Sequence, residues 1–174
     1  MDKNKINYWK LGFAIVITIY YIYYIQSDPY HMNENWNMID GVDLLIHEAG
    51  HWIFSFFGEF ITVLGGSLNQ ILIPCVFTGY FFLRREYYSA SIVLFWVGQN
   101  ILNVATYMGD SIVQQLPLLG GDGSNHDWAF LLTRMGVIQN TEAISSAFRD
   151  FGILVFIFAM LGCLYFSVEK RSQN

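Results

Sequence analysis

The chain carries the sequence H-E-A-G-H at positions 47–51, inside a largely apolar run over residues 44–64. Positions four apart on a helix share a face, so His47 and His51 can bind one metal ion together. Glu48 is not needed as a ligand and can act as a general base toward a metal-activated water. Two imidazoles and a carboxylate are costly to place in an apolar helix without a reason. We therefore interpret the motif as a zinc site with Glu48 as its catalytic residue, rather than as inert polar side chains.

A third ligand must come from elsewhere, because a catalytic zinc usually has three protein ligands and one open position. His126 is ranked first, since its imidazole suits zinc. Asp122 is second, because the glycine-rich loop around it can bring its carboxylate to the metal. Asp127 is third, because it can instead orient His126 or cap the following helix. Asp110 stays open as an alternative ligand or outer-shell group, and a solvated loop with a helix cap is the competing interpretation.

The composition is typical of an integral membrane protein. The 174 residues are 54% hydrophobic and 18% aromatic, only 13% are charged, and mean hydropathy is +0.37. Soluble chains carry about 25% charged residues. The net charge of −5 gives no indication of nucleic-acid binding. Cys75 and Cys163 both lie in apolar segments and are expected to pack as free thiols.

The hydropathy pattern predicts an all-α membrane bundle in a single domain over residues 1–174. We expect about five apolar helical segments, at residues 9–25, 44–64, 68–83, 89–108 and 151–168. The longest polar stretch between them is the loop 111–150. Gly65-Gly66-Ser67 is expected to break the chain between the second and third segments.

A polar stripe marks the fourth segment, where Gln99, Asn103, Tyr107 and Asp110 recur at helical spacing. For Gln99 and Asn103 we favour hydrogen bonds between helices. For Asp110 a hydrogen bond of this kind and a functional role have similar weight, because an acidic residue within a membrane usually has a function.

The distribution of charge predicts four spans plus a re-entrant 44–64 segment, with five plain spans as the alternative. Residues 26–43 hold four acidic and no basic residues and suit the outside. The basic residues near positions 3–10, 84–85 and 170–171 suit the cytoplasm. Only the re-entrant arrangement satisfies all of these preferences, and it needs protein to cover its backbone. We expect the plasma (inner) membrane, with the N-terminus in the cytoplasm and the lipid bilayer as a partner.

Roughly residues 44–128 resemble the site-2 protease family of intramembrane zinc metalloproteases. The resemblance rests on the motif at 47–51, on Gly65-Gly66-Ser67-Leu68-Asn69, which is similar to that family's Gly- and Asn-containing turn, and on Leu118-Leu119-Gly120-Gly121-Asp122-Gly123, which loosely resembles its Leu-Asp-Gly motif. The resemblance implies that Asp122 is the third zinc ligand. The family's Asn-Pro…Pro-Pro lead-in is absent, and the chain looks like a small, divergent relative.

The expected function is a Zn²⁺-dependent membrane hydrolase, with a peptidase acting on a membrane protein as the leading case. A lipid amidase or esterase with the same zinc chemistry is the alternative among enzymes. A zinc-binding membrane protein without catalytic activity, such as a carrier or a partner subunit, is the alternative outside them.

Overall fold

The computed structural model describes residues 5–26, 38–116 and 126–169. Apart from one antiparallel pair of two-residue strands, the elements of the described residues are helices. In chain order they are β1 (Lys5–Ile6), α1 (Tyr8–Gln26), α3 (Met38–Phe54), the 3-10 helix η1 (Ser55–Phe57), α4 (Glu59–Leu83), α5 (Tyr87–Gly109), α6 (Asp127–Arg134), the 3-10 helix η2 (Ile138–Asn140), α7 (Thr141–Phe166) and β2 (Val168–Glu169). The predicted all-α class is therefore confirmed.

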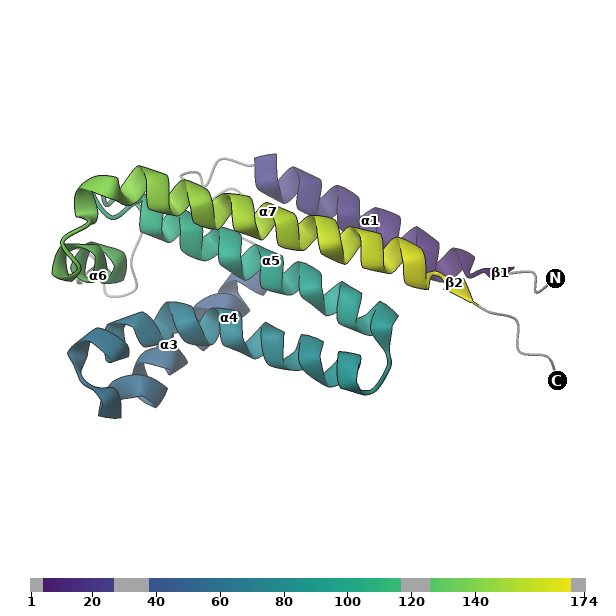
Figure 1. The fold of residues 1–174 in the computed structure, drawn as a ribbon, viewed down its shortest axis with the longest axis horizontal. Helices are drawn as coiled ribbons and strands as arrows, with labels where there is room; N and C mark the ends of the chain where they lie inside the picture. Colours follow the sequence, from purple (N-terminus) through teal and green to yellow (C-terminus); the bar gives the residue numbers. More distant parts are fainter. Residues whose placement is uncertain (1–4, 27–37, 117–125, 170–174) are drawn as a thin grey trace.

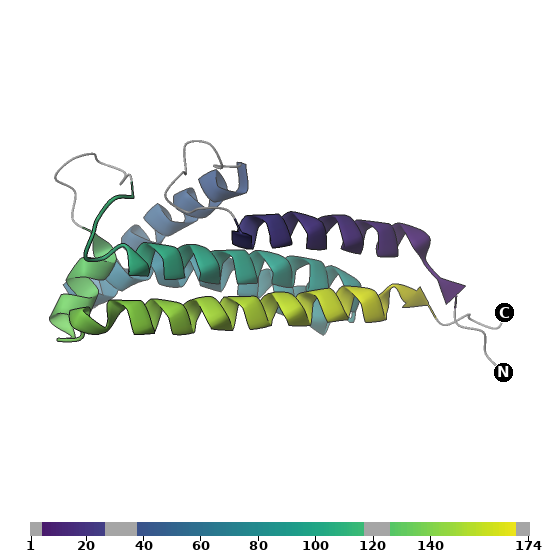
Figure 2. The ribbon, with the colours of Figure 1, turned by 90° about the horizontal axis from the view of Figure 1, so that it is seen from above.

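Helix α5 is the centre of the bundle, with α7, α4 and α1 packed around it. Figures 1 and 2 show α4, α5 and α7 running side by side, while α3 lies against α4. Glycines let α5 and α7 approach closely: a Cβ at Gly98 would meet the Phe156 ring at 3.0 Å, and one at Gly152 would meet Leu102 at 2.8 Å. Small residues at helix contacts are the usual way in which membrane helices come together.

Two apolar cores hold the helices. In the first, the Tyr21 ring of α1 lies 5.1 Å from Phe95 of α5 and 4.8 Å from Phe156 of α7, centroid to centroid. In the second, α6 packs its buried side chains onto the end of α5; they are Trp128, Leu131 and Leu132 against Val104 and Met108. The second core fixes α6 across one end of the bundle.

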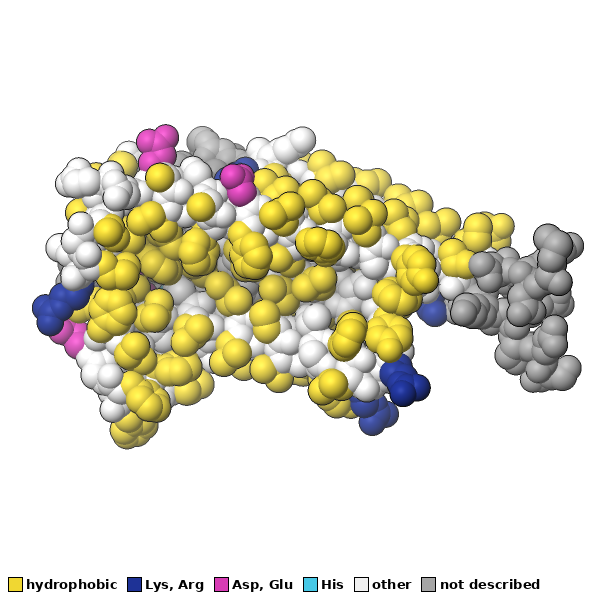
Figure 3. All heavy atoms as spheres, viewed as in Figure 1, with side chains coloured by type: hydrophobic (Ala, Val, Ile, Leu, Met, Phe, Trp, Pro, Cys, Tyr) yellow, Lys and Arg dark blue, Asp and Glu magenta, His cyan; other side chains and the backbone are white. Residues whose placement is uncertain are grey.

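Three helical stretches of the described residues are long and apolar enough to cross a membrane, namely Tyr8–Gln26, Glu59–Leu83 and Ile138–Phe166. Their outer faces are apolar: Trp9 is 91% exposed and Leu83 is 84% exposed. Figure 3 shows an apolar surface over the middle of the bundle, with the charged side chains toward its ends. Exposed apolar surface of this extent indicates a membrane protein.

The expected segments 9–25 and 89–108 agree with helices α1 and α5 to within two residues at each end. The expected segment 44–64 does not correspond to a single helix. The chain turns at residues 55–58, where Gly58 has a φ of +86°, so that segment is divided between α3 and α4. The expected break at Gly65-Gly66-Ser67 is wrong, because α4 continues through these residues to Leu83. The polar stretch 111–150 is also not a plain loop, since it contains α6, η2 and the beginning of α7.

Candidate metal centre

The two histidines of the motif lie where α3 crosses α4 with almost no space between the backbones. A Cβ at Gly50 of α3 would collide with the carbonyl oxygen of Gly65 on α4. A Cβ at Gly66 would lie 2.5 Å from His47 Nε2 and 2.7 Å from His51 Nε2. These glycines therefore let α4 form one wall of the site, and both imidazoles rest against it. This is why α4 keeps a Gly-Gly pair that would weaken an isolated helix by about 1 kcal/mol per glycine.

The Nδ1 atom of His47 is held by a side chain of α4. The Gln70 amide nitrogen donates to Asn103 Oδ1 at 2.9 Å, so Gln70 turns its oxygen, Oε1, toward His47 Nδ1 at 3.1 Å. An amide oxygen only accepts, so His47 Nδ1 must carry the proton. In the neutral ring, Nε2 then has a free lone pair.

His51 is held in the same way by the backbone. Its Nδ1 lies 2.9 Å from the carbonyl oxygen of Thr62, which can only accept, so this Nδ1 also carries the proton. The neutral His51 ring therefore also presents an Nε2 lone pair. Metal-binding histidines in proteins commonly have this arrangement, with the second ring nitrogen bonded to an oxygen that fixes the ring.

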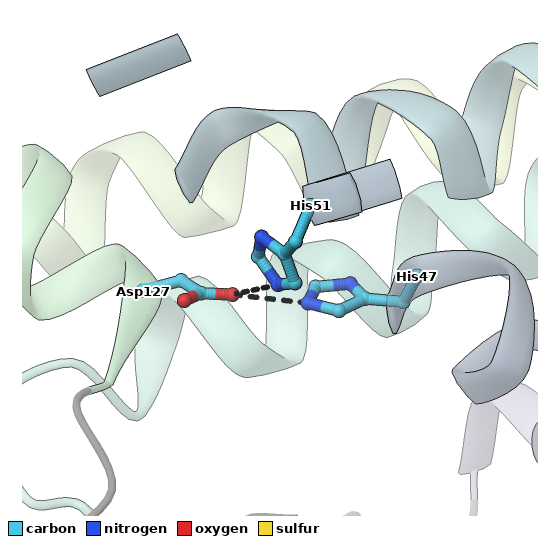
Figure 4. Close-up of side chains that lie close together, drawn as sticks. All are labelled: His47, His51 and Asp127. Atoms are coloured by element: carbon cyan, nitrogen blue, oxygen red, sulfur yellow. Dashed lines mark hydrogen bonds and ion pairs between the residues drawn. The ribbon is translucent and has the colours of Figure 1, made fainter. Parts of the chain in front are cut away.

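Asp127 of α6 completes the group. Its Oδ2 atom lies 3.0 Å from His47 Nε2 and 3.3 Å from His51 Nε2 (Figure 4). The three ligand atoms are all within 4.8 Å of one another. Ligands of a tetrahedral zinc ion lie roughly 3.3 Å apart, given metal–ligand distances of 2.0–2.1 Å. His47, His51 and Asp127 are therefore close enough together to hold one metal ion.

The position of Asp127 follows from how α6 docks. The Trp128 indole nitrogen donates to Ser67 Oγ on α4 at 3.0 Å, next to Gly66. The backbone N–H of Asp127 donates to the Tyr107 hydroxyl on α5 at 3.1 Å. With Leu131 and Leu132 in the second core, these bonds leave the Asp127 carboxylate facing the histidines.

His126, the first-ranked third ligand, does not lie beside the two motif histidines in the structure. His126 precedes α6, and its Nδ1 accepts a hydrogen bond from the Ala129 backbone N–H, so His126 is the helix N-cap. Its Nε2 lies 3.5 Å from Asp110 Oδ2 and its ring packs on Tyr107. Asp122 lies outside the described residues, and the carboxylate beside the two motif histidines is that of Asp127.

Asp110 has a structural task and does not reach the motif. Its two carboxylate oxygens accept from the backbone N–H groups of Gln115 and Leu116 at 2.8 and 3.0 Å. These two bonds hold the backbone that follows α5, and the Asp110 carboxylate also faces His126. Of the polar stripe on α5, Asn103 and Tyr107 support the metal-binding residues. Helical spacing marked these two positions in the sequence, but no local signal identified Gln70 or Thr62.

The charges at the site influence one another strongly. The hydrogen bond that His51 donates to Asp127 raises the pKa of His51 to about 9 in the metal-free protein, against the opposing effect of burial. Burial opposes ionisation of Asp127, but the hydrogen bonds from His47 and His51 outweigh it and lower the pKa of this carboxyl group. The group is thus an ionised carboxylate facing imidazoles that a proton or a metal ion can bridge. Binding of a metal ion would displace protons from these rings.

Glu48 lies next to the metal-binding group without belonging to it. Its charge acts on both His51 and Tyr107, and its side chain is half-buried. The side chain of His51 is 23% exposed, against 9% for His47. His51 is therefore the more accessible of the two histidines. Glu48 directly follows His47 in the chain and is not one of the three candidate ligands.

Comparison of the chain with protein-family models, with curated proteins and with solved structures finds no match.

Proposed function

We propose that the protein is a zinc-dependent hydrolase of the membrane, with His47, His51 and Asp127 as zinc ligands and Glu48 as the general base. One observation carries the proposal. Both imidazoles donate hydrogen bonds from Nδ1–H to fixed oxygens and turn their Nε2 atoms toward a single carboxylate oxygen. Two nitrogen lone pairs and a carboxylate oxygen that face one another repel unless protons or a metal ion lie between them. Two nitrogens and one oxygen form a ligand set that zinc favours.

The three ligands leave one coordination position for substrate or water, as in catalytic zinc sites. A zinc ion held by these three ligands would lower the pKa of a bound water molecule to about 7 and would polarise the carbonyl group of a substrate. Glu48 would accept the proton of the attacking water and then deliver it to the leaving amine or alcohol. Tyr107 and the α6 contacts would keep Asp127 in place during this exchange.

For the substrate we propose a peptide bond of a membrane protein, with a lipid amide or ester as the second candidate. The pattern H-E-x-x-H with a glutamate base is typical of metallopeptidases, which favours the peptide. A third possibility is a zinc-binding protein without catalysis. An inert structural site would be expected to close its shell with a fourth protein ligand. The cluster identified within the described residues has three.

We further propose that α1, α4, α5 and α7 cross the membrane, while α3 and η1 form a re-entrant arm. Both termini of the described chain lie at one end of the bundle, where β1 pairs with β2, and the α4–α5 turn lies toward the same end (Figure 1). That turn contains Arg84 and Arg85, and Lys10 lies nearby in the first turn of α1. The positive-inside rule places this end in the cytoplasm. The metal-binding group is at the other end, near the outer face.

The test is hydrolysis by zinc-loaded protein in lipid nanodiscs, offered a fluorogenic transmembrane peptide and a fluorogenic lipid amide. Glu48→Gln keeps the shape of the side chain but cannot take a proton, so it should retain zinc and lose activity by about 10²- to 10⁴-fold. Glu86→Gln, an exposed glutamate at the opposite end, is the matched control and should keep full activity. Turnover by Glu48→Gln at the wild-type rate would refute the mechanism. Stoichiometric zinc without hydrolysis of either substrate would favour the non-catalytic reading.

A further inference from the structure

A second polar cluster is buried between α3 and α5, on the same face of α3 as His47. Asp40 and Asp43 are one helical turn apart and 7% and 1% exposed. Facing them on α5 are Trp96, Gln99 and Asn100, of which the two amides are fully buried. All three α5 side chains are uncharged, so what they give the two carboxylates is hydrogen bonds and not positive charge.

The side-chain nitrogens of Trp96, Gln99 and Asn100 all donate hydrogen bonds within this cluster. Asp43 Oδ1 accepts from Trp96 Nε1 at 2.7 Å and from Asn100 Nδ2 at 3.2 Å. The second proton of Asn100 Nδ2 goes to the backbone oxygen of Trp96 at 3.0 Å. Gln99 Nε2 donates to Asp40 Oδ1 at 3.0 Å. These bonds also fix the orientation of both amides, because flipping either one would turn its oxygen toward a carboxylate.

Three buried oxygens of this cluster have no donor among the described residues: Asp43 Oδ2, Gln99 Oε1 and Asn100 Oδ1. A buried acceptor without a donor destabilises the folded protein. A proton on Asp43 would supply one donor for the amide oxygens and leave the other without one. A water molecule would supply two donors for the three oxygens. A metal cation shared by the three oxygens would satisfy all of them and would also balance the negative charge of Asp43.

We propose that this cluster is a second metal site, which binds a hard cation such as Na⁺ or Ca²⁺ through Asp43, Gln99 and Asn100, with Asp40 beside it. Carboxylate and amide oxygens without nitrogen or sulfur are the ligands of such cations. The set differs in kind from the His-His-Asp group, which favours zinc. Its occupant ties α3 to α5 one turn before His47, so it stabilises the helix that carries the motif. The proposal does not depend on zinc or on catalysis at the first site.

The test is the thermal unfolding of the full-length zinc-loaded protein in detergent, with NaCl, CaCl₂ or MgCl₂ added against choline chloride of equal ionic strength. A cation at about 100 times its Kd should raise the Tm by roughly 5 °C or more. The cation that acts at the lowest concentration identifies the occupant. If none of these cations raises the Tm of the wild type, the proposal is wrong and protons or water satisfy the three oxygens instead.

Variants locate the effect. Asp43→Asn removes the charged ligand and should abolish the Tm rise, while the exposed Glu142→Gln on α7 should leave it unchanged. If Asp43→Asn does not fold, Asn100→Leu serves in its place, because it removes the amide oxygen and keeps the side-chain volume. A Tm rise of equal size in the wild type and in either cluster variant would mean that the cation binds elsewhere, and the proposal would be wrong.

Discussion

His47 donates its Nδ1 proton to Gln70 Oε1 across 3.1 Å, and Gln70 in turn donates to Asn103 Oδ1 across 2.9 Å. This chain of bonds links the motif helix to α4 and α5. It leaves the Nε2 lone pair of His47 free to bind a metal. The geometry makes Gln70 a positioning residue for His47, although the two are 23 residues apart in sequence.

Gln70→Leu should therefore weaken zinc binding while the protein stays folded. Loss of such an outer-shell bond typically lowers metal affinity by about 10- to 100-fold. Gln70→Glu is the matched variant, because it keeps an oxygen acceptor for His47 Nδ1 and should bind zinc at least as well as the wild type. Competition with a zinc-sensitive dye measures both. Equal affinity in Gln70→Leu and the wild type would show that the bond does not support the site.

Gly66→Ala should abolish stoichiometric zinc binding, because the added Cβ would lie 2.5 Å from His47 Nε2 and 2.7 Å from His51 Nε2. The affinity for zinc should fall by more than about 100-fold, which is the upper end of the loss expected when only a hydrogen bond to a metal ligand is removed. Gly79→Ala on the same helix is the control, since a Cβ there meets nothing within 4 Å. Circular dichroism establishes that both variants remain helical. Full zinc binding by Gly66→Ala would mean that the histidines do not rest against α4.

Asp127→Ala should lower zinc affinity by orders of magnitude, whereas His126→Asn should change it only modestly. Asp127 supplies the oxygen ligand, while His126 acts as the N-cap of α6, a position that Asn also fills well. Isothermal titration with zinc separates the two. A large loss in His126→Asn with little effect in Asp127→Ala would return the third position to His126.

The positions of single cysteines relative to the membrane test the proposed topology. In a background with Cys75 and Cys163 replaced by Ala, Gln139→Cys in η2 should react with an impermeant maleimide added outside the cell. Arg85→Cys in the α4–α5 turn should react only after the membrane is opened. Both side chains are exposed, so reactivity reports sidedness. Reaction of Arg85→Cys from outside would exclude the four-span arrangement.

The sequence was sufficient to identify His47 and His51, because helical periodicity alone places positions four apart on one face. It could not select Asp127 over His126. That choice depends on the docking of α6 through Trp128 and Leu131, a tertiary arrangement that no local pattern specifies. The Gly65-Gly66 pair was misread as a break for a related reason. Local propensity disfavours glycine in a helix, but here the missing side chains allow α3 and its histidines to lie against α4.

The metal content of the purified protein tests the central claim most directly. After expression with zinc and extensive dialysis, elemental analysis of the wild type should find one zinc ion per chain. The double variant His47→Ala, His51→Ala should contain essentially none, since it keeps only the Asp127 carboxylate of the group. A wild type without bound zinc, or a double variant that retains the same stoichiometric zinc, would contradict the account.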